Sequence, residues 1–349
     1  MEIRFYNPEM NFIGVMENQK SLIWRRKFYE PGRFKLFAPL TAENLNLTEK
    51  QNILWMRGSN EAAVIEDRFV EDSTRHAQIE ATGRFTSSYL DRRLIRPKIS
   101  FQGTVEAAMR KILSDAEPIP RVYLGDLNDF PETVSFQATY KNLLSYESKL
   151  ARSANIGFRL RPNFNEKKMY FETYKGVDRS RSQSVNHRVI FSENYENLNE
   201  VSFRENDQFY KNVVYIGGVG ANDERIFVSF GTETGLDRRE LFVDARDITW
   251  DEGMTEAQYK EKLLQRGHEK QAAEYDEVKT ISCLTNANAN FVYKTDYDLG
   301  DIVTVHKKSW GISADLRITE IEEIYERGAM KVSPVFGSVL PEAIDWRDD

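Results

Sequence analysis

The sequence is poor in cysteine and histidine. Its 349 residues include one cysteine, Cys283, and four histidines. A single cysteine excludes an intrachain disulfide, and so few cysteines and histidines leave no ligand set for structural zinc. We therefore expect a fold that is stabilised by its own core and made in a reducing cytoplasm.

Long apolar runs are also missing. The chain contains no apolar stretch of about 18 residues, which a membrane-spanning helix would need. The first residues, MEIRFYNPEM, alternate in character and carry charges early, unlike a signal peptide. The sequence therefore predicts neither membrane insertion nor secretion.

Positive charge is not in excess. The 48 Lys and Arg residues against 55 Asp and Glu residues give a net charge of −7, and the pI is about 5.5. Binding to nucleic acid needs a basic face, so we expect no specific nucleic-acid binding. The basic cluster Trp24–Lys27 is interpreted as a solvated strand end or a protein contact.

What the sequence does have is aromatic residues, which make up 12% of the chain. Together with frequent valine and isoleucine they favour β structure. Short alternating segments separated by turn residues predict six or seven strands in the first part of the chain. We expect residues 1–97 to form a β-barrel domain.

The hydrophobic period then changes from two to 3.6. Thr104 stands in N-cap position before an apolar stripe that ends before Pro118, and a second helix is predicted near Tyr140–Asn155, ending near Gly157. Strands follow both helices. Residues 98–187 are predicted to form a small α+β domain.

Strand patterns return from about residue 188. We expect residues 188–338 to form a second β-barrel domain, followed by a C-terminal tail at 339–349. Thr255 and Gln258 form a capping box that begins a charged helix reaching about Glu274, which we expect on the outside of this barrel. The predicted class is mainly β with an α+β insert.

Two distant segments share a pattern. Residues 62–85 and 315–337 each contain a strand that alternates apolar and acidic residues, followed by a return strand that ends at or near a glycine. Both a chance similarity of two hairpins and the duplication of one barrel account for this likeness.

No group of residues meets the requirements of a catalytic or cofactor site. Gly217, Gly218 and Gly220 follow a predicted strand, but Asp223 stands where a dinucleotide fingerprint needs its third glycine, so a hairpin turn is the better interpretation. Cys283 has no base partner recognisable in the sequence and is interpreted as a buried thiol. We expect no enzymatic activity, no cofactor and no metal.

Several strings in the third domain resemble a known family. GLDRRELFVDARD at residues 235–247 is the most specific, and Val189–Glu205 and Tyr297–Val305 support it. They closely resemble the siphophage tail-hub family, which comprises baseplate hub or tail-associated proteins of long-tailed phages, prophages and phage-tail-like particles. The likeness is strongest over residues 140–338.

The resemblance implies a fold and an assembly. Members have two β-barrels similar to tail-tube subunits, with smaller α+β domains beside them, and assemble as trimers that adapt a sixfold tube to a threefold tip. The implied location is the distal end of a virion tail, assembled in the host cytoplasm. The implied partners are further copies of the chain, the tail tube or distal tail protein, the tape measure protein, and a spike or receptor-binding assembly.

A hub would also form part of the channel through which DNA passes. An acidic channel wall repels phosphate, and we expect Glu66, Glu71, Glu320 and Glu322 to face it. The segment around Trp346, Arg347 and Asp348 is a candidate docking tail. The resemblance implies that larger relatives carry peptidase or wall-degrading activity in a C-terminal extension, and because the sequence stops at Asp349 we expect no such activity here. The alternative function is a cell-wall hydrolase or carbohydrate-binding protein of the tail tip.

Overall fold

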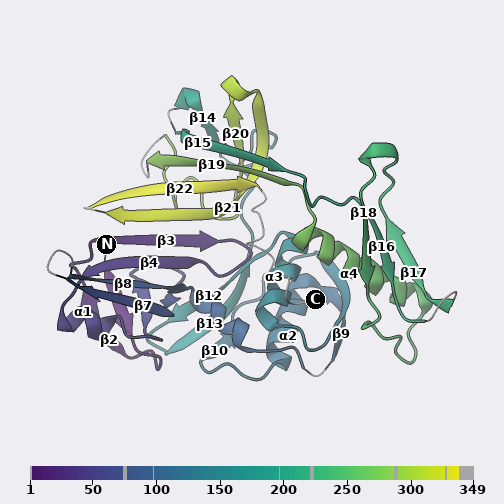
Figure 1. Ribbon diagram of the computed structural model, residues 1–349, viewed down its shortest axis with the longest axis horizontal. Helices are drawn as coiled ribbons and strands as arrows, with labels where there is room; N and C mark the ends of the chain where they lie inside the picture. The colour runs from purple at the N-terminus through teal and green to yellow at the C-terminus, as the bar shows by residue number, and fades with distance from the viewer. Residues whose placement is uncertain are drawn as a thin grey trace.

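The computed structural model describes residues 2–73, 77–96, 98–195, 197–220, 224–286, 290–326 and 328–337. Strands dominate it, and the few longer helices gather on one side of the molecule (Figure 1). The predicted mainly-β class is confirmed.

The first part of the chain forms two sheets that face each other. Its elements are β1 (Ile3–Tyr6), β2 (Phe12–Met16), β3 (Ser21–Lys27), β4 (Arg33–Pro39), α1 (Ala42–Leu47), β5 (Ile53–Met56), β6 (Ala63–Val64), β7 (Asp67–Asp72) and β8 (Ala77–Arg84). One sheet has the order β2-β1-β5-β6, and the other contains β3-β4-β8-β7. Alternation along β4 turns Phe34 and Leu36 into the core between them, where Trp24 lies 4.2 Å from Phe85, centroid to centroid.

The middle of the chain forms an α+β unit. Its elements are η1 (Thr86–Arg92), β9 (Ile99–Thr104), α2 (Val105–Asp115), β10 (Val122–Leu124), β11 (Thr133–Ala138), α3 (Leu143–Ala154), β12 (Gly157–Asn163) and β13 (Lys168–Tyr174). The Thr104 hydroxyl accepts a hydrogen bond from the Ala107 N–H, so the predicted cap of α2 is present. Helix α3 ends at Ala154, a little before the predicted end near Gly157, because its C-cap Asn155 adopts the left-handed conformation with φ 54° that asparagine tolerates.

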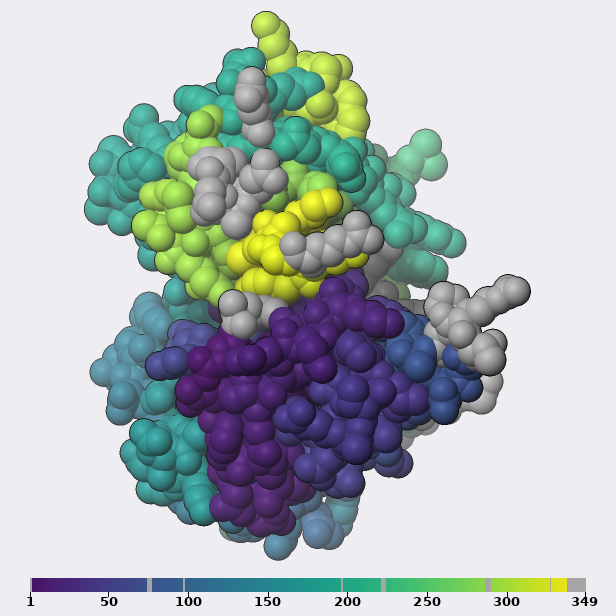
Figure 2. All heavy atoms as spheres, turned by 90° about the vertical axis from the view of Figure 1, so that its left-hand side faces the viewer, coloured from purple at the N-terminus to yellow at the C-terminus, as the bar shows by residue number. Residues whose placement is uncertain are grey.

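The last part of the chain extends the sheet that contains β3. Its strands are β14 (Ile190–Ser192), β15 (Asn199–Asn206), β19 (Val278–Asn286), β20 (Ile302–Lys307), β21 (Ile312–Glu326) and β22 (Ala329–Gly337). They run in the order β15-β19-β22-β21, after which β21 pairs with β3; β20 and β14 attach to the start of β21. Figure 2 shows the yellow strands of this region lying directly on the purple N-terminal region.

Residues between β15 and β19 leave this sheet. They form β16 (Val213–Gly217), β17 (Phe227–Phe230), β18 (Glu240–Asp244) and α4 (Glu256–Glu274), a unit that projects to one side in Figure 1. The strands make a sheet of their own with a core of Val214, Ile216 and Tyr259. The capping box predicted at Thr255 is present. We predicted these strands in the second barrel, but they form a separate sheet. Helix α4, predicted on the outside of that barrel, packs between this small sheet and α3 and β11 of the middle unit. Its residues Tyr259 and Leu263 are buried against the small sheet.

Neither β-rich region is a closed barrel among the described strands. The eight-strand path ends at β15 on one side and at β7 on the other. The pairings of the described strands join both regions in one continuous sheet, and the two β-barrel domains stay a prediction.

Candidate assembly surface

The continuous sheet consists of two halves with the same internal order. We call β3, β4, β7 and β8 the first half-sheet and β15, β19, β21 and β22 the second half-sheet. In each, the strands lie in the order first, second, fourth, third along the chain, and every pairing is antiparallel. The hairpins that share the sequence pattern, β7–β8 and β21–β22, occupy equivalent places.

The halves join through β21 and β3. Seven residue pairs run from Glu320↔Lys27 to Glu326↔Ser21, so the third strand of one half meets the first strand of the other. These residues are about 300 positions apart in the sequence, and only the fold brings them together.

A buried ionic network lies beneath the junction. Arg26 of β3 has a side chain that is 6% exposed, and its guanidinium donates to Glu61 Oε2 at 2.8 Å and to Asp298 Oδ1 at 2.6 Å. Burial alone would lower the pKa of Arg26, but Tyr293, Asp298 and Glu61 raise it well above its ordinary value. Arg26 therefore stays charged and links Glu61 of the first β-rich region to Asp298 of the last.

The network continues to the second half-sheet. Arg26 also donates to the Tyr293 hydroxyl at 2.9 Å, and this hydroxyl donates to Glu323 Oε1 at 2.7 Å. Glu323 is fully buried, forms an ion pair with Lys294 Nζ at 3.0 Å, and accepts a hydrogen bond from the Tyr325 hydroxyl. Burial raises the pKa of Tyr293 well above its ordinary value, so it remains a hydrogen-bond donor. Removing one member would leave a buried charge without compensation.

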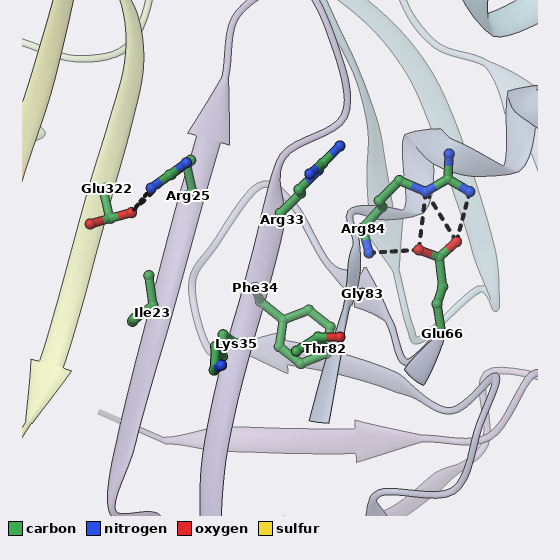
Figure 3. A pocket seen from close by; sticks show the side chains of 10 residues that line it. All are labelled: Ile23, Arg25, Arg33, Phe34, Lys35, Glu66, Thr82, Gly83, Arg84 and Glu322. Carbon is green, nitrogen blue, oxygen red and sulfur yellow. Dashed lines mark hydrogen bonds and ion pairs between the residues drawn. The ribbon is translucent and has the colours of Figure 1, made fainter. Parts of the chain in front are cut away.

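The opposite face of the same strands is open to solvent. It holds a shallow groove of about 520 Å³ that crosses β21, β3, β4 and β8 (Figure 3). The lining residues combine four cations with two carboxylates and four uncharged residues: Arg25, Arg33, Lys35, Arg84, Glu66, Glu322, Ile23, Phe34, Thr82 and Gly83. We call this surface the groove face.

Three arginines form one row across the groove. The register pairs Arg25 with Arg33, and Arg33 with Arg84. Carboxylates hold both ends: Arg25 Nε donates to Glu322 at 2.8 Å, and Arg84 Nη2 to Glu66 at 2.8 Å. Figure 3 shows Arg33 between these two pairs. Like charges directly opposite each other in a sheet are unfavourable, so the row is a feature that packing alone does not require.

The structure places all four predicted channel acids on or beside this face. Glu66 and Glu322 line the groove. Glu320 lies two residues before Glu322 on β21, so both side chains are on the same face of the sheet. Glu71 on the edge strand β7 pairs with Gln78, which shares the groove face of β8 with Thr82. Three of them are paired with cations, because Lys27 binds Glu320 at 3.5 Å in addition to the two arginine pairs. Burial raises the pKa of Glu320. The face is thus mixed in charge; whether it lines a channel stays a prediction.

The free edges of the sheet are exposed. Most residues of β15 and β7 are solvent-exposed, including Phe203 at 40% and Phe69 at 58%. Exposed edge strands carry unpaired backbone groups that template pairing with another chain. β15 is the first strand of its half and β7 the third of its half, so the two edges are equivalent to the strands that meet at the junction.

The residues that were considered for catalysis or cofactor binding, Cys283 and the glycines at 217–220, have structural roles. Cys283 is 2% exposed, and burial raises the pKa of its thiol to about 12, so it is not an activated nucleophile. Gly217 ends β16, and Gly218 and Gly220 follow it before the antiparallel strand β17; Arg225 donates to the carbonyls of Gly217 and Gly218. Among the described residues no group of three or more His, Cys, Asp or Glu side chains is arranged to hold a metal. No helix in the described ranges is long and apolar enough to cross a membrane. The candidate docking residues Trp346, Arg347 and Asp348 lie outside the described residues.

Comparison with known families decides the relationship. The family model described as Siphovirus ReqiPepy6 Gp37-like protein matches residues 2–338. The chain belongs to this family. The resemblance to siphophage tail proteins drawn from the sequence is thereby confirmed, and no curated protein matches the chain.

Solved structures of tail proteins share the fold of this Gp37-like chain over almost its whole length. The tail protein of Neisseria meningitidis MC58 has a TM-score of 0.62 at 11% identity, with 97% of this chain and 96% of that chain covered. The 43 kDa tail protein of prophage MuSo2 from Shewanella oneidensis has a TM-score of 0.60 at 11% identity, covering 98% and 99%. Prophage tail protein gp18 of Listeria monocytogenes EGD-e has a TM-score of 0.58 at 14% identity, covering 96% and 94%.

Sequence analysis missed the residues that join the two halves. The cluster Trp24–Lys27 was interpreted as a solvated strand end or a protein contact, yet Arg26 and Lys27 are buried, and only Arg25 is exposed. Alternation predicts that Trp24 and Arg26 share a face. Because Trp24 belongs in the core, the signal for a buried Arg26 was present in the string, but its partners at 61, 293 and 298 were not recognisable.

Proposed function

We propose that this Gp37-like protein is the structural hub at the distal end of a siphophage tail, assembled as a homotrimer. The observation that carries the proposal is the head-to-tail repetition of one strand order in the two half-sheets. Three copies with two half-sheets each supply six equivalent units, which matches a sixfold tube while keeping threefold symmetry for the tip.

The junction between β21 and β3 is a template for contacts between copies. If β7 of one copy pairs with β15 of the next, the third strand of one half meets the first strand of another, as it does within the chain. Such a contact is heterologous, and it closes into a ring only when the rotation per unit divides a full turn. The exposure of both edge strands supports this arrangement.

In such a ring the groove face is the surface available to line the channel. The opposite face is covered, in the first half by the sheet β2-β1-β5-β6, whereas the groove face carries charged side chains in water. We infer that DNA passes along it in the virion. The other partners follow from the same position: the tail tube or distal tail protein, the tape measure protein, and a spike or receptor-binding assembly. We infer no enzymatic role, and incubation with host peptidoglycan should release no fragments.

The test is the mass of the purified chain in solution. Light scattering should give three times 40.6 kDa, and images should show a ring with six similar lobes. Phe203→Lys on the edge strand β15 should reduce the trimer to a monomer, because lysine blocks edge pairing. Phe227→Lys is the matched control, since Phe227 is a similarly exposed phenylalanine, at 52%, on the edge strand β17 of the small sheet. A stable wild-type monomer, or equal loss of trimer in both variants, would contradict the proposal.

A further inference from the structure

The row of Arg25, Arg33 and Arg84 is arranged to receive carboxylates. Both outer arginines already bind glutamate side chains, so the geometry of the row suits this ligand. The groove lining has two more cations than carboxylates, although the protein as a whole is acidic. Further carboxylates surround the groove, such as Glu80 on Lys35 and Asp91 on Arg84. These carboxylates would repel a polyanion whose charges are closely spaced. An extended peptide can instead place single carboxylates at the arginines, between the acids of the groove.

The chain itself contains an acidic segment that directly follows a strand of the same sheet. Residues 338–349, SVLPEAIDWRDD, carry four acids and one arginine. They follow Gly337, the last residue of β22, whose carbonyl accepts the Thr319 hydroxyl at 2.8 Å. Strand β22 is separated from β3 only by β21.

The segment is long enough to reach the arginine row from Gly337. Gly337 lies four residues along β22 from Ser333, which pairs with Glu322 in the row, and Arg33 is three strands away from β22. Strand geometry places Arg33 about 20 Å from Gly337. Asp345 follows Gly337 by eight residues, and a chain of that length reaches about 27 Å. A tether this short gives an effective concentration in the millimolar range, which favours even weak ion pairs.

We propose that the acidic segment 338–349 docks on the arginine row of its own chain, with its carboxylates at Arg33 and its neighbours. The inference does not depend on the trimer, because the segment and the groove belong to one molecule. The contact is electrostatic and exposed, so it weakens as salt is added.

A disulfide trap tests the contact in the full-length protein. Thr82→Cys places a thiol in the groove without touching the arginines, and Asp345→Cys places one in the segment; buried Cys283 does not interfere. The control pairs Asp345→Cys with Ser229→Cys, an exposed position on β17. We expect at least about fivefold more intrachain disulfide in the groove pair than in the control, falling with salt.

Charge reversal then separates docking from chance encounter. Arg33→Glu in the groove pair should lower the disulfide yield about threefold or more, and Glu342→Lys in the same protein should restore part of it. Circular dichroism checks that the variants are folded. Equal yields in the groove and control pairs, disulfides only between chains, or no effect of Arg33→Glu would overturn the proposal.

Discussion

The two half-sheets share one framework and differ in what connects its strands. In the first half, β3 and β4 are joined by the short segment 28–32; in the second, the equivalent strands β15 and β19 are separated by residues 207–277, which contain β16, β17, β18 and α4. The strand order is nevertheless identical. The comparison teaches that the hydrogen-bonded frame tolerates a large insertion at one of its turns, since a longer loop adds little entropic penalty when its ends stay close.

The two faces of the joined sheet also differ, because one is buried and the other is exposed to solvent. On one face Arg26 lies in a buried network that spans both halves, and on the other Arg25, its neighbour in the chain, pairs with Glu322 in solvent. Two neighbouring arginines of one strand therefore differ in burial and in the ion pairs that they form. Its contribution depends on which face the strand buries.

The largest effect is expected from breaking the buried side of the junction. Arg26→Met should lower the free energy of unfolding by about 3–5 kcal/mol, because Glu61 and Glu323 remain buried with less compensation. Arg25→Met is the matched control and should change it by about 0–1 kcal/mol. Urea unfolding followed by fluorescence measures both. Similar losses in the two variants would refute the difference between the faces.

Equivalent glycines near the ends of the two return strands provide a second test. A Cβ on Gly83 would lie 1.9 Å from the Val64 carbonyl oxygen, and one on Gly337 would lie 2.1 Å from that of Lys279. Gly83→Ala and Gly337→Ala should each destabilise by about 1–3 kcal/mol, since backbone must move. The control, Gly58→Ala, has open space and pays only for its positive φ, about 1 kcal/mol. Thermal unfolding of the three variants ranks them, and a control as damaging as the other two would contradict the prediction.

The unit between the halves offers a pH test. Glu147 in α3 is fully buried without a hydrogen-bond partner for either carboxyl oxygen among the described residues, and burial raises its pKa well above 4.5. The folded state therefore holds this proton to a higher pH than the unfolded state, so stability falls as pH rises above about 4.5, by about 1.4 kcal/mol per unit until the folded pKa is reached.

Glu147→Gln removes this dependence. Relative to the natural protein, the variant should gain stability from pH 5 to pH 8 and differ least near pH 4.5. Urea unfolding at several pH values measures the difference. A constant difference across the range would show that Glu147 does not titrate in this way.

The smallest effect concerns the caps of the same unit. Thr104→Ala should lower the free energy of unfolding by about 1 kcal/mol, since the hydroxyl satisfies the Ala107 N–H at the start of α2. Asn142→Ala, which removes the equivalent cap of α3, should act similarly. Thr249→Ala, at a hydroxyl outside any helix start, serves as the comparison in the same thermal-unfolding measurement.

Local features were predictable from the sequence to a large extent. The caps at Thr104 and Thr255 lie where their sequence signals put them, because capping depends on residues three positions apart. The strands of the first region follow their alternation. The destination of β16, β17 and β18 was not predictable, since a strand pattern shows that one face is buried but not which sheet it joins.

The sequence by itself determined the mainly-β class, the starts of α2 and α4, and the resemblance to a tail protein family; the short helix α1 was not predicted. Only the tertiary structure decided that β21 pairs with β3, that buried Arg26 binds Glu61 and Asp298, and that three arginines share one row. The physical reason is range. Capping and periodicity act between neighbours in the chain, whereas strand register is fixed by cores and hydrogen bonds that form between segments hundreds of residues apart.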